Sequence, residues 1–128
     1  MDQPVRPPPG TAPERGLCFE YALTILATVT SRPTADRVIT DAGFKTLSDN
    51  DEWHPLVLDH PDFTLAYLSA EHGVWLRSAD GPPVAIGQQL EIIPDYHDTT
   101  TFRHDAFIGL RDGLVETVIP LLARGRLT

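Results

Sequence analysis

The sequence predicts an all-β fold, a small β-barrel or sandwich that forms one domain. Three observations lead to this prediction. Short stretches rich in β-branched residues recur along the chain. Turn signals separate these stretches at fairly regular spacing, and the strongest is Asp112-Gly113, a dipeptide typical of tight hairpins. No stretch shows a convincing helical period of apolar residues.

The first strands are predicted from side-chain type and alternation. Residues 22–31 are dense in β-branched residues that separate onto two faces. Arg32-Pro33 is expected to end this strand, because proline cannot donate to a sheet ladder. A second strand is predicted at 36–40, and Asp41-Ala42-Gly43 should turn out of it with its glycine able to adopt a positive φ. Residues 48–62 are polar, contain two prolines and predict a long loop.

Five further strands are expected in the second half of the chain, at 63–70, 74–76, 89–93, 106–110 and 114–122. A proline- and glycine-rich turn separates the second of these from the third, and the hairpin dipeptide joins the last two. Residues 1–16 are rich in proline and lack apolar periodicity, which predicts a flexible lead-in. The folded domain is therefore expected at 17–128.

The charge balance argues against two classes of partner. The chain has 128 residues, with 18 acidic and 10 basic side chains and a formal charge of −8. Binding to nucleic acid or to an anionic membrane surface requires a basic face, and no run of Lys or Arg supplies one. No window approaches 18 uninterrupted apolar residues, so no segment is expected to span a membrane.

Two features predict a cytoplasmic location. The N-terminus lacks the basic and apolar regions of a signal peptide. The single cysteine, Cys18, cannot form an internal disulfide, which is consistent with a reducing compartment. The chain also has only one lysine, Lys45, so any Schiff base made by this chain alone would have to use it.

The most informative stretch is Ile92-Ile93-Pro94-Asp95-Tyr96-His97-Asp98. The strand predicted at 89–93 stops at a proline, and polar, potentially metal-binding side chains gather after it. Sites built on strand ends are held more rigidly than sites on loops. The chain contains no phosphate-binding loop, no Gly-x-Ser-x-Gly elbow and no Cys-x-x-Cys pair. A candidate functional site is therefore expected at this strand end.

Further motifs flank this stretch, and together they carry a family resemblance. In chain order they are Ala27-Thr28-Val29-Thr30-Ser31-Arg32-Pro33, Asp41-Ala42-Gly43-Phe44-Lys45, Glu71-His72-Gly73 and Ala123-Arg124-Gly125-Arg126. The series resembles the C-terminal domain of the D-serine dehydratase / D-threonine aldolase family, whose members are alanine racemase-like. The resemblance covers roughly Phe19 to Arg126 and implies an alanine racemase C-terminal-like β-domain.

Enzymes of this family use pyridoxal phosphate (PLP) and a divalent metal ion. The resemblance implies a β-domain that closes the active site and supplies metal ligands, whereas the PLP lysine belongs to a TIM barrel that this sequence lacks. PLP is therefore expected only through a partner barrel. Lys45 is expected in a structural turn or at a domain interface. In the family, the metal polarises the substrate's β-hydroxyl and assists elimination or retro-aldol cleavage.

Family members carry Pro-x-His-x-Cys or Pro-x-His-x-Asp at this strand end. Residues i and i+2 of an extended chain point the same way, so the two side chains can share one metal ion. Counting from Pro94, Tyr96 occupies the family's His position and Asp98 its Cys/Asp position, with His97 between them. Three interpretations remain open. A bulge brings His97 and Asp98 together as ligands of zinc, manganese or magnesium; Asp98 alone retains a weakened site; or these are ordinary surface groups.

His72 and His97 are the candidate catalytic residues. His72 lies in the Glu-His-Gly motif, which matches the family letter for letter. It is expected either in the wall of the active site or in a turn where its role is structural. His97 and Asp98, with His72, would supply acid and base groups if the domain acted without a partner.

Three functions stay open. The resemblance implies a metal- and substrate-site domain of a PLP-dependent D-amino-acid lyase, of D-threonine aldolase or D-serine dehydratase type, which needs a separate barrel for catalysis. Alternatively, the chain is a non-catalytic interaction or structural β-domain with a degenerate metal site. The third alternative is a stand-alone enzyme that uses His97 and Asp98 on a small molecule. The expected partners are a PLP-barrel chain or a second copy, with a small D-amino acid as substrate.

Overall fold

The computed structural model describes residues 21–49 and 54–126. Eight strands and one short helix follow one another in the order β1 to β6, α1, β7 and β8. The lead-in predicted at 1–16 and Cys18 lie outside the described residues. Within the described ranges, no helix is long and apolar enough to cross a membrane.

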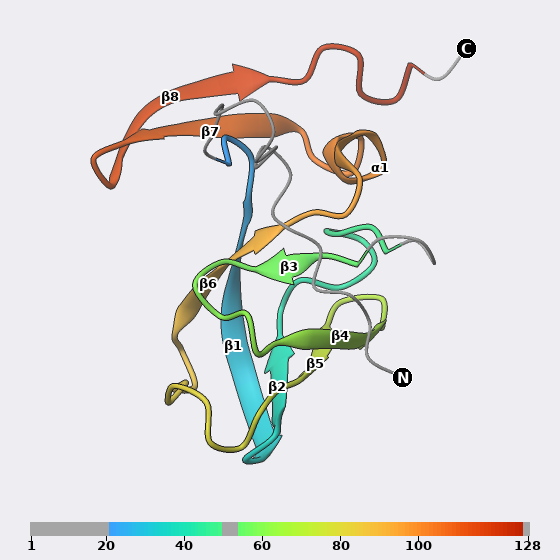
Figure 1. Ribbon diagram of the computed structural model, residues 1–128. Helices are drawn as coiled ribbons and strands as arrows, with labels where there is room; N and C mark the ends of the chain where they lie inside the picture. Colours follow the sequence, from blue (N-terminus) through green and yellow to red (C-terminus); the bar gives the residue numbers. More distant parts are fainter. Residues whose placement is uncertain (1–20, 50–53, 127–128) are drawn as a thin grey trace, which may run out of the picture.

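Six strands form one antiparallel sheet, in the order β3-β6-β1-β2-β5-β4. The sheet curls round on itself into a nearly closed barrel (Figure 1). This architecture confirms the predicted all-β fold. Of the two forms that were expected, a small barrel or a sandwich, it is the barrel. The strands are β1 (Ile25–Thr34), β2 (Arg37–Thr40), β3 (Leu56–Val57), β4 (Thr64–Leu68), β5 (Gly73–Leu76) and β6 (Gln89–Ile93).

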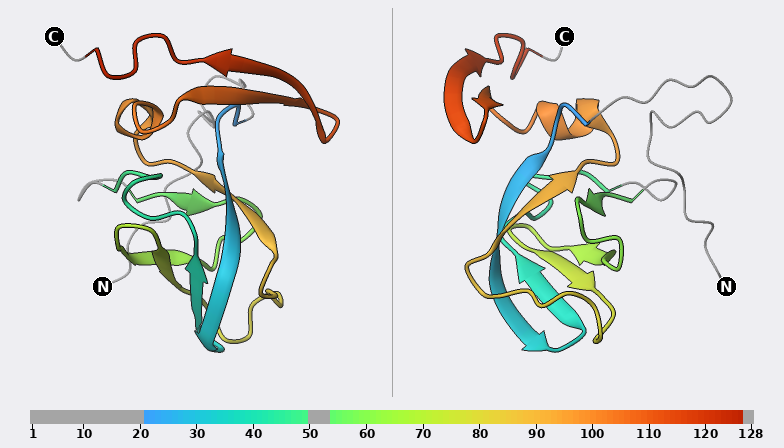
Figure 2. Two further views of the ribbon diagram at one scale, coloured as in Figure 1. Left: turned by 180° about the vertical axis from the view of Figure 1, so that it is seen from behind. Right: turned by 60° about the vertical axis from the view of Figure 1, so that its left-hand side comes forward.

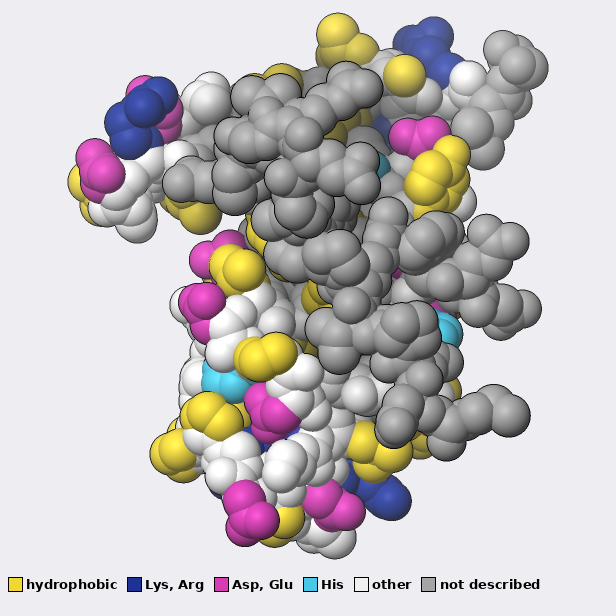
Figure 3. Space-filling view, viewed as in Figure 1, with side chains coloured by type: hydrophobic (Ala, Val, Ile, Leu, Met, Phe, Trp, Pro, Cys, Tyr) yellow, Lys and Arg dark blue, Asp and Glu magenta, His cyan; other side chains and the backbone are white. Residues whose placement is uncertain are grey.

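The last two strands, β7 (Ala106–Arg111) and β8 (Leu114–Pro120), form a separate two-stranded ribbon. Asp112 and Gly113 connect them with φ values of 52° and 76°, the positive values that a type I′ turn requires. The hairpin prediction is therefore confirmed. Two views show the ribbon at the same end of the molecule as α1 (Figure 2). Charged side chains gather at the free tip of the ribbon (Figure 3).

The barrel core is built around Trp75 of β5, which is fully buried. Its indole Nε1 donates a hydrogen bond to Oγ1 of Thr40, 3.1 Å away, so the one polar atom of the indole is satisfied. Val38 and Thr40 of β2 both face inward, as their period-2 spacing dictates. Leu90 and Ile92 do the same on β6 and complete the wall of the barrel that leads to the candidate site.

One strand continues through a proline. Arg32-Pro33 was expected to end the first strand, but β1 runs to Thr34. The pairing of β1 with β2 shifts register between Ser31 and Thr34, so an irregularity in the ladder accommodates the residue that cannot donate. The prediction that proline terminates this strand is therefore wrong.

Two short elements were not expected from sequence. The helix α1 spans His97–Thr101, where no helix was predicted. Its five residues are too few to display an apolar period of 3.6, so the pattern that normally predicts a helix is absent. β3 lies inside the predicted long loop, and its two residues pair with the end of β6. Both elements lie next to the strand end that carries the candidate site.

Candidate functional site

The strand end predicted to carry the site turns into a helix rather than continuing as an extended chain. Tyr96 is the N-cap of α1 and is extended, with φ −140° and ψ 119°. His97 and Asp98 already belong to the helix, where successive side chains diverge by about 100°. The extended-chain rule that aligns residues i and i+2 therefore does not continue past Tyr96. His97 and Asp98 are both exposed.

Tyr96 and Asp98 contact one another directly. The phenol Oη of Tyr96 donates a hydrogen bond to Oδ2 of Asp98, 2.9 Å away. This hydrogen bond, together with the negative charge of Asp98, raises the pKa of the Tyr96 phenol above its ordinary value. Tyr96 is therefore a neutral proton donor directed at the carboxylate of Asp98.

A metal ion would find an incomplete set of ligands here. In residues 21–49 and 54–126, no group of three or more His, Cys, Asp or Glu side chains is arranged to hold one. One oxygen of Asp98 is engaged by Tyr96, and the neighbouring His97 side chain diverges along the helix. Metal sites in proteins usually draw on three or more protein ligands. The residues present do not by themselves form a complete metal centre.

A buried hydroxyl network lies beneath this turn. Ser48 and Thr100 are only 5% and 1% exposed, and their Oγ atoms are 2.9 Å apart. Ser48 Oγ also contacts the carboxylate of Asp95 and the carbonyl oxygen of Tyr96, the latter at 3.2 Å. A serine hydroxyl carries one proton, so it donates to one of these acceptors while Thr100 donates to it. The network fixes the strand end to the loop that contains Ser48.

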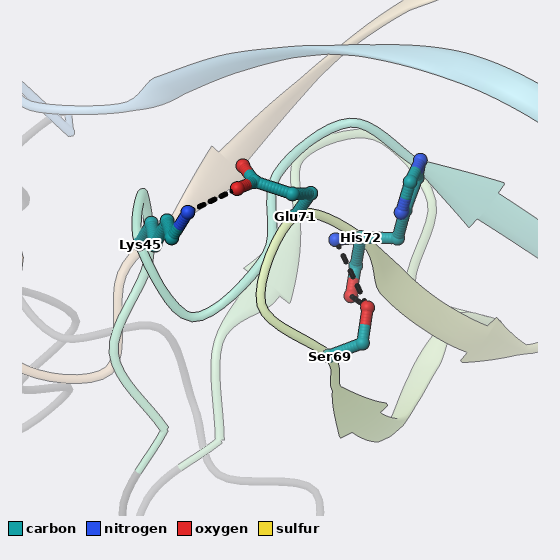
Figure 4. Close-up of polar contacts among 4 residues, drawn as sticks. All are labelled: Lys45, Ser69, Glu71 and His72. Carbon is teal, nitrogen blue, oxygen red and sulfur yellow. Dashed lines mark hydrogen bonds and ion pairs between the residues drawn. The ribbon is translucent and has the colours of Figure 1, made fainter.

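The Glu71-His72-Gly73 motif forms the tight turn between β4 and β5 (Figure 4). The His72 N–H donates to Ser69 Oγ at 3.2 Å, and the Ser69 hydroxyl and N–H donate to the His72 carbonyl oxygen at 3.1 and 2.8 Å. The imidazole points away from the ion pair that Glu71 forms with Lys45 (Figure 4). His72 is thus held through its backbone, while its ring is left exposed.

The Asp41-Ala42-Gly43-Phe44-Lys45 motif packs directly on that turn. We call residues 41–49 the bridging loop. Its Phe44 and Lys45 N–H groups donate to the carbonyl oxygens of Ser69 and Ala70, at 2.8 and 3.1 Å. The Lys45 ammonium forms an ion pair with Glu71. Lys45 therefore lies in a turn where one motif packs on another, which is one of the two positions expected for it.

Gly43 is required by close approach. The glycines with positive φ in the described residues are Gly87, Gly113 and Gly125, so Gly43 does not use the positive φ that glycine allows. A Cβ on Gly43 would lie 2.6 Å from the Ser69 carbonyl oxygen, and closer still to backbone atoms of the turn. The missing side chain allows the two motifs to touch.

The bridging loop also contacts the segment that follows α1. Arg103 Nε donates to the Phe44 carbonyl oxygen at 2.8 Å, and its guanidinium lies 4.8 Å from the ring centres of Phe44 and Phe102. His104 Nε2 lies 2.8 Å from the Thr46 carbonyl oxygen, where its N–H can donate. One loop therefore connects the Glu-His-Gly turn to the strand end.

The structure does not join the predicted site residues to one another. Among the described residues, no hydrogen bond or ion pair connects His72 with His97 or Asp98. The residues that sequence reasoning missed are Ser48 and Thr100, which hold the strand end in place. They are separated by 52 residues along the chain, so no local spacing could have indicated that they meet.

Comparison with known proteins identifies the family. The model of the "Putative serine dehydratase domain" matches residues 22–110, which is most of the chain. The chain belongs to this family. It is the D-serine dehydratase / D-threonine aldolase family of PLP-dependent enzymes, so the resemblance inferred from the motifs is confirmed.

Two relatives differ greatly in length. The D-threonine aldolase of Arthrobacter sp. is 37% identical over 109 residues, which cover 85% of this chain but only 28% of the aldolase. An uncharacterised protein from Mycobacterium bovis is 32% identical over 123 residues, covering 88% of this chain and 92% of that protein. The chain thus spans less than a third of the aldolase and nearly all of the mycobacterial relative.

A solved structure shows the same fold within a larger enzyme. The D-threonine aldolase from Filomicrobium marinum superimposes with a TM-score of 0.78 and 33% identity, over 86% of this chain and 30% of that one. This match confirms the predicted β-domain architecture.

Replacing Gly43 with alanine should destabilise the domain strongly. The new Cβ would overlap backbone atoms, which cannot move aside as a flexible side chain could. We expect the free energy of unfolding, measured with urea, to fall by about 3 kcal/mol, the upper end of the cost of overpacking. The matched control is Gly87→Ala, where φ is +87° but space is open. It should cost only about 1 kcal/mol of backbone strain. Equal losses would contradict the close-approach explanation.

Replacing Asp98 with asparagine should lower the pKa of Tyr96 toward 10.0, its ordinary value. The change removes the negative charge and the carboxylate acceptor that stabilise the protonated phenol. Ultraviolet titration of tyrosinate measures this pKa, and subtraction of the Tyr96→Phe curve isolates it from the other tyrosines. The pKa of Tyr96 is higher in the folded state than in the unfolded state. The contribution of the Tyr96–Asp98 hydrogen bond to folding stability is therefore fully present below the unfolded-state pKa, and it is lost as pH rises through the folded-state pKa. An unchanged titration in Asp98→Asn, as expected for the control Asp80→Asn, would refute the contact.

Proposed function

We propose that this chain is the substrate-side β-domain of a PLP-dependent lyase for small D-3-hydroxy amino acids, and that it acts together with a separate barrel. One observation carries this proposal. Nearly the whole chain superimposes on a D-threonine aldolase, yet it accounts for only 30% of that enzyme. The candidate reactions are retro-aldol cleavage of D-threonine and elimination from D-serine.

The arrangement of the motifs supports a role beside a partner. The bridging loop fixes the Glu-His-Gly turn and the strand end to one rigid barrel, so both can be presented as one surface. Tyr96 and Asp98 are exposed at this surface, where they can meet a substrate held by the partner. Asp98 can accept a hydrogen bond from a substrate ammonium or hydroxyl group. Tyr96, whose pKa is raised, keeps its proton available at Oη.

The cofactor would be held by the partner. PLP bound in such a barrel supplies an electron sink for the substrate's α-carbon. The family resemblance assigns the covalent link to PLP to a lysine of the barrel, and Lys45, the only lysine of this chain, forms an exposed ion pair with Glu71. This chain's residues would close the site from the opposite side and exclude water from it.

A divalent metal ion would require shared ligands. His97 and Asp98 are the ligand-type side chains that this chain offers at the family position, and they fall short of a complete set. Any ion bound there would need further ligands from the barrel or from the substrate.

A second candidate is a non-catalytic docking domain with a degenerate metal site. The observation in its favour is that Tyr96 occupies the family's histidine position and engages Asp98. In that case Asp98→Ala would leave both the metal content and the activity of the complex unchanged. The third function, a stand-alone enzyme, lacks support among the described residues, because no hydrogen bond or ion pair joins His72 to His97 or Asp98.

Purification of the tagged chain from its native cells tests the proposal. We expect a PLP-binding barrel protein to co-purify, with an absorbance band at about 410–430 nm. The complex should cleave D-threonine or deaminate D-serine, whereas the chain alone should do neither. The control variant Lys45→Ala should retain the band, because the lysine attached to PLP belongs to the partner. Activity of the isolated chain, or capture without any PLP protein, would contradict the proposal.

A further inference from the structure

The β7–β8 ribbon has one face made only of apolar side chains. Ala106, Ile108 and Leu110 alternate along β7 and therefore point the same way. Their partners across the ribbon are Pro120, Val118 and Val115, which share that face. We call these six residues the ribbon face. Its four central side chains, Ile108, Leu110, Val115 and Val118, are 55% to 64% exposed.

The ribbon lacks support from the rest of the described structure. It pairs with no strand of the six-stranded sheet, and all seven residues of β8 are exposed. Its base is fixed by the Leu121 N–H, which donates to the Asp105 carbonyl oxygen at 2.9 Å, and by an ion pair between Arg124 and Asp105. An isolated two-stranded ribbon is only marginally stable in water. An exposed apolar face and a free strand edge of this kind indicate a binding surface.

The charge distribution favours another protein over a second copy as the occupant. The charged side chains of the ribbon are Arg111, Asp112 and Glu116, all near its tip, where Arg111 and Glu116 pair at 3.1 Å (Figure 3). The ribbon face itself offers no charge pair that would specify a symmetric contact. Each copy also carries a formal charge of −8, which opposes association of two copies.

The comparisons indicate what kind of partner lies against this domain. In the D-threonine aldolases it is joined to a part more than twice its own size, because the match covers only 28% to 30% of those proteins. In both views the ribbon lies at the same end of the molecule as α1 (Figure 2). Tyr96 is the N-cap of α1 and Asp98 belongs to it, so the Tyr96–Asp98 pair lies at this end as well. A partner seated on the ribbon would therefore also reach the candidate site.

We propose that the ribbon face is the surface on which the PLP-binding barrel docks. This inference rests on the proposed function and adds the location of the interface. Burial of the ribbon face would stabilise both the complex and the hairpin, since β8 is exposed along its whole length and no strand of the described sheet pairs with the ribbon. The contact would also fix the barrel over the Tyr96–Asp98 end of the domain.

The test compares capture of the PLP protein by matched variants of the full chain. The double variant Leu110→Glu/Val118→Glu places charges at the centre of the ribbon face. It should lower the amount of captured PLP protein at least about tenfold, as expected for central interface positions. The control is Ile86→Glu, which changes an apolar residue that is 65% exposed. It belongs to the loop between β5 and β6, which runs along the end of the barrel away from the ribbon (Figure 1). Capture by this control should match that of the unmodified chain.

Circular dichroism and thermal melting confirm that each variant is folded. If the double glutamate variant unfolds, the variants Val118→Thr and Leu110→Gln take its place, because their side chains are closer in shape to the original ones. The amount of PLP protein that each captures is again compared with that of the unmodified chain, and it should be lower. Undiminished capture by folded ribbon variants would overturn the docking surface and leave the proposed function standing. Failure of the unmodified chain to capture any PLP protein would overturn both. A dimer of the purified chain that the ribbon variants dissociate would assign the face to a second copy instead.

Discussion

The close packing of the bridging loop on the β4–β5 turn is the constraint on which the candidate site depends. Two glycines make it possible. Gly43 of the loop lies against the turn's backbone, and a Cβ on Gly73 of the turn would lie 2.7 Å from the carbonyl oxygen of Ala42 in the loop. Each motif thus leaves out a side chain where the other approaches. Once packed, the loop is held by backbone hydrogen bonds and places Ser48 beneath the strand end. The barrel, the turn and the strand end therefore form one unit.

This arrangement separates structural from chemical roles within the family's motifs. The Asp-Ala-Gly-Phe-Lys and Glu-His-Gly motifs interact largely through backbone atoms and one ion pair, so much of their identity is explained by folding. The candidate site residues Tyr96, His97 and Asp98 lie instead at the strand end. There, Tyr96 donates a hydrogen bond to Asp98, at the position where the family resemblance implies a histidine. Asp98 could still contact a substrate held by a partner barrel in either of two ways. The hydrogen bond between Tyr96 and Asp98 would first break, or the Tyr96 phenol would contact the substrate together with Asp98.

The sequence predicted the features that depend on local chemistry. The positions of most strands and the Asp112-Gly113 turn follow from side-chain alternation and from φ preferences. The family could also be predicted, because it is carried by short motifs. The missed features depend on contacts between distant residues. The Ser48–Thr100 contact joins residues far apart in the chain, and α1 is too short to have a period. For Gly43, the sequence indicated the conformational freedom of glycine. It could not show that the backbone of the β4–β5 turn lies where a Cβ would be. Pro33 was expected to end β1, yet a register shift that depends on β2 accommodates it.

Native-state amide hydrogen exchange tests the central claim most directly. The amides of Phe44, Lys45 and Ser48 donate to Ser69, Ala70 and Thr100, respectively. If the bridging loop is part of the barrel's cooperative unit, these amides should exchange with the same free energy and the same denaturant dependence as amides of β5. Exchange at a much lower free energy, insensitive to denaturant, would show that the loop opens independently. In that case its packing could not be what fixes the candidate site.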